Sequence, residues 1–333
     1  MRILSLIYSL AGGGGRVAAD LIRGLSSCQH KIFHIGEDPQ FSTGQDSELK
    51  RLNVPVKRVL NNRLAKELDE FKPHIVLYHW WPLPSNTYDP NIIKRRAPSI
   101  LISHYNAPPP EGFDFYVAVS RFGASFMRAL PHRKVFIIHN GVDTTRYRFP
   151  KEPHDGFING RISSLEAKKI PLDYPAFLAS FDIPNMKSVI VGDGPRRADL
   201  IAISQKLNSS HSFEFPGRLD NDSVRKLLAT FDVSVYLTDT HLEVHSISLI
   251  EKALAGIVII GEPRGGIPEQ VVHCETGFLS HNRNELKAFC EKLYRDRELL
   301  DEMSRAAREF ANRFSLENMA EKYRSLIEDI VLR

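Results

Sequence analysis

Two glutamates, Glu243 and Glu251, stand eight residues apart in the segment EVHSISLIEKALAG. The sequence predicts a short turn after Glu243 and then a helix that carries Glu251 in its second turn. The backbone N–H groups of Ser246, Ile247 and Ser248 would open that helix, and the partial charge of about +0.5 at such an end binds phosphate groups. A carboxylate before the turn can hold the hydroxyls of a sugar, and one farther along the helix can hold a ribose. On its own, this spacing is common and usually means two solvated glutamates; the strand before it and the segment ALAGIVIIGEPRGGIPEQV after it make it far more specific.

Four glycines, Gly12–Gly15, lie between the first predicted strand and the first predicted helix. Two of them, with Ala18, satisfy the G-x-G-x-x-A spacing of dinucleotide-binding loops, and Glu37 stands where an acid that binds a ribose would lie. A glycine run also arises wherever a ligand must approach the backbone at a helix N-terminus, and Arg16 adds a cation there. We favour this second interpretation because more specific signals lie elsewhere in the chain.

The elements that would position these residues follow from the hydrophobic pattern. Six apolar runs in the first half predict strands that are buried on both faces: RILSLIY, KIFHI, HIVLY, SILIS, FYVAV and KVFII. Helical patterns lie between several of them, at residues 15–26, 63–71 and 120–130. Repeated βαβ units of this kind predict a doubly wound parallel sheet.

The pattern breaks at residues 149–156, FPKEPHDG, where prolines, a glycine and charges indicate a linker. The alternation then starts again with the runs GFING, SVIVG, FEFPG, VSVYL, GIVIIG and FLS, and a last helix is predicted at about 316–331. We therefore expect a Rossmann-like domain at 1–150, a second one at 151–315, and a C-terminal helix at 316–333 that packs back on the first domain. Ligands would bind between the carboxyl edges of the two sheets.

The composition is ordinary for a globular protein. Of the 333 residues, 42% are hydrophobic and 25% are charged, which excludes a disordered chain, a collagen-like repeat and a coiled coil. The three cysteines show no CxxC spacing, so we expect neither a disulfide framework nor a structural zinc site, and a reducing compartment fits best. No run approaches 18 uninterrupted apolar residues, so no transmembrane helix is expected. These features together predict a cytoplasmic protein.

The stretch 231–279 resembles the C-terminal domain of the retaining glycosyltransferases of the GT-B fold, the group 1 or family 4 type. That group includes sucrose-phosphate synthases, bacterial glycogen synthases and lipid-linked mannosyltransferases. Its members show an E-x-F-G or E-x-x-P turn, a helix of type L-x-E-A-x-A-x-G, and then G-G-x-x-E. The matching residues are Glu243, Ser248, Glu251, Ala253, Ala255, Gly256, Gly265, Gly266 and Glu269. Residues 119–149 resemble the end of the first domain of the same enzymes, so the resemblance implies an α/β protein with two Rossmann-like domains facing a central cleft.

The resemblance also implies two cations for the diphosphate of the donor. The family places an Arg and a Lys on the loop after the first strand of the second domain. This chain has Arg161 and Lys168 there, with Lys169 as the alternative. Such cations would neutralise the charge that grows on the diphosphate as the sugar–phosphate bond breaks.

Further site residues follow from the same resemblance. A family histidine near the C6 hydroxyl of the sugar corresponds to His104 in ILISHYN, with His79 in LYHWW as the weaker candidate. The loop FPGRLDNDSV matches the loop that frames the nucleotide base. The implied donor contacts outside the helix start are Gly14, Gly15, Lys169, Arg218 and Leu219.

Two positions depart from the family pattern. The spacing from Arg161 to Lys168 is longer than the commonest family spacing, which leaves the choice between Lys168 and Lys169 open. The usual glycine of the turn is replaced in Val244-His245-Ser246, so the turn must form without it.

We therefore expect a retaining hexosyltransferase-type enzyme that moves a sugar from a nucleotide diphosphate sugar to an acceptor. In such enzymes Glu251 would hold the ribose and Glu243 the transferred sugar, and the departing phosphate is thought to accept the proton of the acceptor during front-face attack. We expect no covalent nucleophile, no metal ion and no further cofactor. Two alternatives remain, a nucleotide-sugar 2-epimerase of the same fold and a catalytically silent nucleotide-sugar-binding protein.

Charge is distributed unevenly along the chain. Residues 1–150 hold 20 Lys and Arg against 12 Asp and Glu, a net charge of +8, whereas residues 151–333 hold 24 against 28, a net charge of −4. A basic first domain favours an anionic acceptor or a lipid-linked one at a membrane surface, and peripheral contact with the inner face of the membrane. The cluster Lys94-Arg95-Arg96 lacks interleaved aromatic residues, so nucleic-acid binding is not expected.

Overall fold

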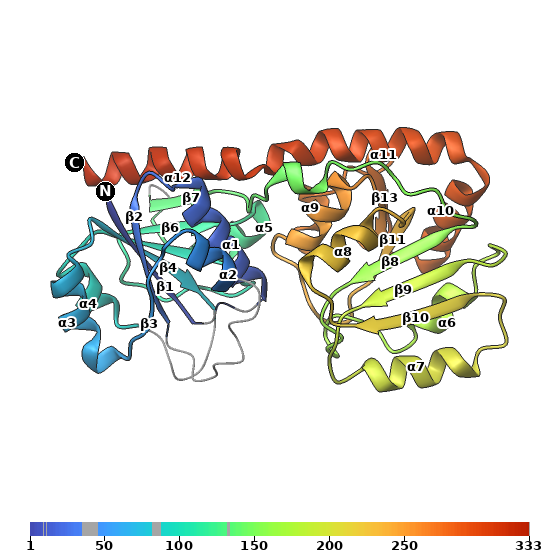
Figure 1. Cartoon of the computed structure of the whole chain (residues 1–333), viewed down its shortest axis with the longest axis horizontal. Helices are drawn as coiled ribbons and strands as arrows, with labels where there is room; N and C mark the ends of the chain where they lie inside the picture. Colours follow the sequence, from blue (N-terminus) through green and yellow to red (C-terminus); the bar gives the residue numbers. More distant parts are fainter. Residues whose placement is uncertain (9, 11, 35–45, 82–87, 132–133, 333) are drawn as a thin grey trace. The chain divides into compact units, whose positions relative to one another are not determined.

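The computed structural model describes residues 1–8, 10, 12–34, 46–81, 88–131 and 134–332. The chain divides into two compact units. Unit 1 comprises Met1–Asp143 and Phe314–Arg333, and unit 2 comprises Thr144–Arg313. Each unit contains a parallel β-sheet with its own helices (Figure 1). The α/β class expected from the two runs of βα alternation is confirmed.

The sheet of unit 1 has seven strands in the order β3-β2-β1-β4-β5-β6-β7. Its strands are β1 (Arg2–Ile7), β2 (Gln29–His34), β3 (Val56–Arg58), β4 (Ile75–Trp80), β5 (Ser99–Ser103), β6 (Phe115–Ala118) and β7 (Val135–Ile137). Its helices are α1 (Gly12–Gly24), α2 (Asp46–Arg51), α3 (Asn61–Phe71), α4 (Pro90–Lys94), α5 (Arg121–Ala124) and α12 (Leu316–Val331), and a 3-10 turn, η2, covers Ser125–Met127. The strand order changes direction between β1 and β4, and ligands of doubly wound sheets bind at the carboxyl ends of the strands at such a point.

The sheet of unit 2 has six strands in the order β10-β9-β8-β11-β12-β13. Its strands are β8 (Ile158–Ile162), β9 (Lys187–Val191), β10 (Ser212–Gly217), β11 (Val233–Tyr236), β12 (Val258–Gly261) and β13 (Gly277–Leu279). Its helices are α6 (Tyr174–Ala179), α7 (Arg197–Lys206), α8 (Asn221–Leu228), α9 (Ile247–Leu254), α10 (Arg283–Arg295) and α11 (Arg297–Ala311), with 3-10 turns η4 (Thr144–Tyr147) and η5 (Ile267–Glu269). The order changes direction between β8 and β11, so the segments that follow these two strands meet at one place.

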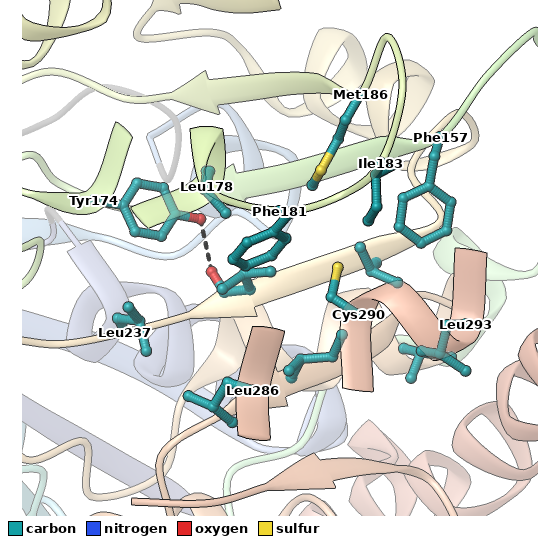
Figure 2. Packing of buried hydrophobic residues seen from close by; sticks show 14 of the residues in the cluster. Phe157, Tyr174, Leu178, Phe181, Ile183, Met186, Leu237, Leu286, Cys290 and Leu293 are labelled. Carbon is teal, nitrogen blue, oxygen red and sulfur yellow. Dashed lines mark hydrogen bonds between the residues drawn. The ribbon is translucent and has the colours of Figure 1, made fainter. Parts of the chain in front are cut away.

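The core of unit 2 forms where the apolar strands meet the apolar faces of the helices. Figure 2 shows part of it, with Leu178 of α6 and Leu286, Cys290 and Leu293 of α10 packed near the sheet. All of these side chains are buried. The hydroxyl of Tyr174 donates to the backbone oxygen of Val235 at 2.7 Å, so its polar atom is satisfied within the core. This packing fixes β11, the strand that precedes Glu243.

The division between the units falls at 143/144 and at 313/314, whereas the sequence places these boundaries at 150/151 and 315/316. Residues 144–152 attach to unit 2, since Tyr147 bonds to α9 and the Glu152 backbone N–H donates to the Ala229 carbonyl oxygen. In unit 1, the N–H of Val142 donates to the Phe314 carbonyl at 3.0 Å, and α12 then packs beside α1. The sequence gives no direct signal for these backbone contacts.

Candidate functional site

In unit 2, the end of β11 and the segment before α9 bring a tyrosine to a glutamate. Tyr236 is the last residue of β11, and its hydroxyl donates to Oε1 of Glu243 at 2.8 Å. Burial and the charge of Glu243 raise the pKa of Tyr236, which keeps the phenol protonated and able to donate. The Glu243 side chain is 12% exposed, so it lies nearly buried at the carboxyl edge of the sheet.

The turn from Glu243 to Ser246 is stabilised by residues of a later loop, Gly266 and Gln270. The N–H of Gly266 donates to the Glu243 carbonyl oxygen at 2.7 Å. A Cβ at Gly266 would lie 1.9 Å from the Val244 carbonyl oxygen, so only glycine allows this close approach. Gln270 completes the support: its Oε1 accepts from the Ser246 N–H and its Nε2 donates to the Ser246 carbonyl, both at 2.8 Å. The turn therefore forms without a glycine of its own, and Gln270 is a residue that the sequence reasoning missed.

Three groups hold the carboxylate of Glu243 ionised. Burial by itself would raise its pKa, but the hydrogen bond from His241, the charge of Lys169 and the bond from Tyr236 hold the pKa well below its usual range. Nζ of Lys169 lies 3.6 Å from Oε1, and Nε2 of His241 lies 3.5 Å from Oε2. An ionised carboxylate only accepts hydrogen bonds, which suits it to the hydroxyls of a sugar.

Arg161 lies elsewhere than the resemblance implies. The resemblance implies the loop after the first strand of the second domain, whereas Arg161 is the fourth residue of β8 and is 0% exposed. Its Nη2 donates to the Lys169 carbonyl oxygen at 2.7 Å and its Nε donates to Oγ of Ser163 at 3.2 Å. The guanidinium carbon lies 4.0 Å from the centre of the Tyr236 ring. Arg161 thus fastens the loop that carries Lys169 to the end of β11.

The structure separates the two candidate lysines. Nζ of Lys168 lies 3.3 Å from Glu166, and its side chain is 48% exposed. Lys169 reaches Glu243 instead, with 28% of its side chain exposed. The backbone carbonyl of Lys168 accepts from the N–H of His241 at 3.0 Å. The structure therefore brings Lys169, and not the side chain of Lys168, to the group around Glu243.

The start of α9 faces the same region. Ser246 occupies the N-cap position with extended backbone angles, and its side chain makes no capping hydrogen bond. Ile247 and Ser248 follow in the first turn. Glu251, in the second turn, accepts a hydrogen bond of 2.5 Å from the hydroxyl of Tyr147. Tyr147 was missed by the sequence reasoning, although it lies in the segment 119–149 that carries part of the resemblance.

Arg218 and Leu219 follow the carboxyl end of β10, two strands from β8 in the sheet order. Arg218 is exposed and Leu219 is half-buried. Asp220 then caps α8 by accepting from the N–H of Ser223 at 2.8 Å. These residues lie along the same carboxyl edge as Glu243 and Lys169.

Unit 1 holds the remaining candidates at the carboxyl edge of its own sheet. Nδ1 of His79, in β4, lies 3.1 Å from Nε2 of His104, which follows β5, and the two rings are stacked with planes 3° apart. Burial lowers the pKa of His104 to about 4 and that of His79 well below its ordinary value. Both imidazoles are thus neutral at neutral pH.

The glycine run begins α1 at the same edge of unit 1. A Cβ at Gly14 would lie 3.7 Å from the ring of Trp81 and 4.0 Å from that of His104. At Gly15, a Cβ would lie 2.1 Å from the Leu10 carbonyl oxygen. Gly14 and His104 are therefore neighbours within unit 1, whereas the other donor candidates belong to unit 2. Glu37 lies outside the described residues.

Metal-binding clusters and membrane-spanning helices are both absent from the described residues. No group of three His, Cys, Asp or Glu side chains in this part of the chain is arranged to hold a metal ion. No helix among the same residues is long and apolar enough to span a membrane.

A family model described as "Glycosyl transferases group 1" matches residues 163–310. These residues include Lys169, Glu243, Glu251 and Gln270. Unit 2 belongs to the group 1 glycosyl transferases. The resemblance of residues 231–279 to the group 1 enzymes is thereby confirmed, on a matched segment that begins just after β8.

Two curated relatives match similar lengths of this chain. The N-acetyl-alpha-D-glucosaminyl L-malate synthase of Bacillus anthracis is 30% identical over 148 residues, 44% of this chain and 38% of that protein. The GDP-Man:Man(3)GlcNAc(2)-PP-Dol alpha-1,2-mannosyltransferase of Dictyostelium discoideum is 28% identical over 154 residues, 44% of this chain and 30% of that protein. The alignments thus span only about a third of the length of these relatives.

Solved structures match the whole chain at low identity. HepE of Anabaena, solved in complex with UDP-glucose, has a TM-score of 0.79 and 18% identity, over 99% of this chain and 100% of that one. The sucrose-phosphate synthase of Thermosynechococcus elongatus has a TM-score of 0.78 and 14% identity, over 100% of both chains. These likenesses and the two parallel sheets show that the chain has the GT-B fold.

Proposed function

We propose that this group 1 glycosyl transferase moves a hexose from a nucleotide diphosphate sugar to an acceptor and retains the anomeric configuration. The observation that carries the proposal is the ionised Glu243 beside Lys169 at the start of α9. A cation, a helix N-terminus and a hydroxyl-binding carboxylate together suit a sugar diphosphate. One of the two relatives is an N-acetyl-alpha-D-glucosaminyl L-malate synthase, the other is an alpha-1,2-mannosyltransferase, and HepE was solved with UDP-glucose, which supports the same substrate class.

In this proposal the diphosphate lies between Lys169 and the N–H groups of Ile247 and Ser248. Lys169 supplies a mobile ammonium, and the helix start supplies fixed dipoles. Arg161 is fully buried, so it does not contact the donor directly. It holds the backbone of Lys169 by a hydrogen bond, and its charge adds to the positive potential at the site. Glu243 accepts hydrogen bonds from the transferred sugar, and Glu251, positioned by Tyr147, accepts those of the ribose.

The proposed reaction breaks the bond between the anomeric carbon and the diphosphate oxygen, whose electron pair leaves with the diphosphate. Lys169, Arg161 and the α9 dipole stabilise that negative charge as it develops. A diphosphate oxygen takes the proton of the attacking hydroxyl on the same face, so no side chain needs to form a covalent intermediate. Because the protein itself supplies the positive charge, we expect transfer to persist in a metal chelator.

A panel of UDP-, GDP- and ADP-sugars tests this function. Release of the nucleoside diphosphate is measured with and without candidate acceptors, and NMR of the product reports the anomeric configuration. Lys169→Met should lower kcat by roughly 10²–10³, equivalent to about 2–4 kcal/mol, because it removes a cation aimed at the leaving group. Lys168→Met is the matched control, because the Lys168 side chain pairs with Glu166 and not with Glu243. Its kcat should stay within a few-fold of the wild-type value.

The same assay separates the alternatives. An equal decrease of kcat in Lys169→Met and Lys168→Met would contradict the role given to Lys169. A product epimerised at C2 would favour the nucleotide-sugar 2-epimerase, and binding without turnover for every donor would favour a silent nucleotide-sugar-binding protein. Inversion of the anomeric carbon would contradict the retaining mechanism.

We assign the acceptor to unit 1, with His104 and Gly14 at the carboxyl edge of its sheet. The paired, neutral His79 and His104 offer hydrogen bonds to hydroxyls without adding charge. The exposed ring of Trp81 lies 5.8 Å from that of Tyr105 and offers an apolar surface beside them, which suits the face of a sugar ring. These features favour a glycan or a lipid-linked sugar as the acceptor.

Peripheral membrane contact through unit 1 is the last part of this proposal. A groove at the amino ends of β5 and β6 is lined by Lys94, Arg95, Arg96 and Lys134, with Asp114 as its acidic member. Arg96 is engaged by Asp69 at 2.8 Å, whereas Arg95 is exposed. Arg95→Glu should weaken binding to vesicles that contain anionic lipid, most clearly at low salt. If the wild-type protein does not bind vesicles that contain anionic lipid at low salt, the proposed membrane contact is wrong.

A further inference from the structure

Helix α9 carries one lysine, Lys252, that the roles given above leave unused. It lies in the second turn and is 0% exposed. Its Nζ lies 5.1 Å from the centre of the Tyr236 ring. Within the described ranges of the chain, no residue forms a hydrogen bond with this buried Nζ. An ammonium group without a hydrogen-bond acceptor is strongly unfavourable in a protein interior.

A second buried cation shares the same ring. The guanidinium of Arg161 lies 4.0 Å from the centre of the Tyr236 ring, and its Nη1 is also buried without a hydrogen bond to any described residue. A guanidinium keeps its proton in proteins, so the cost of crowding two cations falls on the lysine. Both basic side chains lie over the ring of Tyr236, and the hydroxyl of that ring donates a hydrogen bond to Glu243.

The groups that face Lys252 come from β8, β11, α9 and the turn before it. Burial first, and then the charge of Arg161, lower the pKa of Lys252 well below its ordinary value. Glu251 and Glu243 act in the opposite direction without restoring it. The neighbouring Tyr236 is neutral, because its own pKa is raised. In the free protein, burial, the lack of a hydrogen-bond acceptor among the described residues and the neighbouring guanidinium therefore all favour the uncharged amine of Lys252.

We propose that Lys252 takes up a proton from solvent when the diphosphate of the donor binds at the start of α9. The inference rests on the proposed function, since it requires a nucleoside diphosphate in that position. The negative charges of the diphosphate act through the poorly polarisable interior and favour the ammonium form. The proton comes from the buffer, and no covalent bond forms or breaks. Donor binding thereby switches on a third positive charge beside Arg161 and Lys169.

Isothermal titration calorimetry of the full chain with UDP, GDP and ADP measures this uptake directly. At about pH 8 the phosphates of these nucleotides are fully ionised, so their own titration does not contribute. Two buffers of contrasting ionisation enthalpy are compared, and the heat of wild-type binding should differ between them by the amount that a partial proton uptake requires. The affinity of the wild-type protein for the nucleoside diphosphate should also fall as the pH rises from about 7 to 9. The total decrease should be tenfold for each unit by which nucleotide binding raises the pKa of Lys252.

Lys252→Met keeps a chain of similar length and removes the amine, so it should bind without proton uptake and with an affinity about tenfold lower at pH 7. Lys292→Met, on an exposed position of α10, is the matched control and should retain the wild-type uptake. Lys252→Gln repeats the test if the methionine variant folds poorly in a thermal unfolding scan.

Nucleotide binding without uptake in the wild type, or with the same uptake in Lys252→Met, would overturn the inference and leave the proposed function intact. If the wild type binds none of the three nucleotides, the proposed function itself fails, and this inference fails with it.

Discussion

Among single residues, the buried titratable groups of the two units have opposite charge states: a carboxylate is ionised in unit 2 and two imidazoles are neutral in unit 1. Glu243 is ionised although it is nearly buried, because His241, Lys169 and Tyr236 all favour its charged form. His79 and His104 are neutral, because burial disfavours their charged forms and each would face the other as a cation. Unit 2 therefore presents a charged group that accepts hydrogen bonds, and unit 1 presents a neutral pair, as the proposed donor and acceptor sites require.

The histidine pair predicts a loss of stability in mild acid. Above the unfolded pKa of about 6.5 both states are neutral, and the contribution of the pair is fully present. As the pH falls below that value, the unfolded chain gains protons that the folded chain refuses, until about pH 4, where His104 also protonates. The free energy of unfolding should therefore fall by at most about 1.4 kcal/mol per pH unit for His79, and by less for the partly exposed His104.

Urea unfolding of the chain between about pH 7 and pH 4 measures this slope. His79→Phe should flatten it, whereas His281→Asn, at an exposed position, should leave it unchanged. A slope that is the same in all three proteins would show that the pair has no part in the acid sensitivity.

At the scale of elements, the start of α9 depends on a loop that lies more than fifteen residues away in sequence. The glycines at 265 and 266 let that loop approach the Glu243 backbone, and Gln270 replaces the missing backbone partners of Ser246. The N-cap serine makes no capping hydrogen bond with its own side chain, and Gln270 supplies the hydrogen bonds to its backbone. The family motif G-G-x-x-E thus supports the E-x7-E turn.

Gln270→Ala tests this support. It leaves the buried N–H and carbonyl of Ser246 without their partner, which should destabilise unit 2 by about 1–3 kcal/mol. Because the turn carries Glu243, donor affinity should fall as well. Thermal unfolding and nucleotide titration measure the two effects, with Gln205→Ala, exposed on α7, as the control. Full donor affinity in Gln270→Ala would mean that the turn holds its shape without the glutamine.

At the scale of the whole molecule, the C-terminal helix belongs to the unit that the N-terminus begins. α12 packs beside α1, and Nη2 of Arg324 donates to the Gly24 carbonyl oxygen at 3.3 Å. A Cβ at Gly24 would lie 2.5 Å from that of Ala320, so the two helices are as close as glycine allows. Unit 1 therefore closes only after the chain has passed through unit 2.

Gly24→Ala should loosen this contact by about 1–3 kcal/mol, because the new methyl group overlaps Ala320. Hydrogen exchange should speed up in α1 and α12 and stay unchanged in the helices of unit 2. Adding Ala320→Gly should restore part of the protection. Faster exchange spread evenly over both units would contradict a contact that acts within unit 1 alone.

Much of the fold and part of the site follow from local patterns. The alternation of apolar runs and amphipathic segments determines two parallel sheets, because strands buried on both faces read as continuous apolar runs. The span of α12, at Leu316–Val331, is the one expected. The short β3 was not expected, since Val56–Arg58 is exposed and has no apolar run, and the expected helix at 120–130 is split into α5 and a 3-10 turn.

Local sequence was enough to predict that Glu243 and Glu251 flank a helix start after a central strand, because spacing along the chain fixes that geometry. The three-dimensional contacts alone show that Lys169 rather than Lys168 reaches Glu243 and that Arg161 is buried beside the Tyr236 ring. They also show that Gln270 bonds the backbone of Ser246 and that Tyr147 bonds Glu251. Each of these contacts joins different strands or loops, and the fold of the sheet, rather than neighbouring sequence, sets which side chains meet at its carboxyl edge. The same reason hides the buried Lys252, whose unusual state depends on a cation 91 positions earlier in the chain.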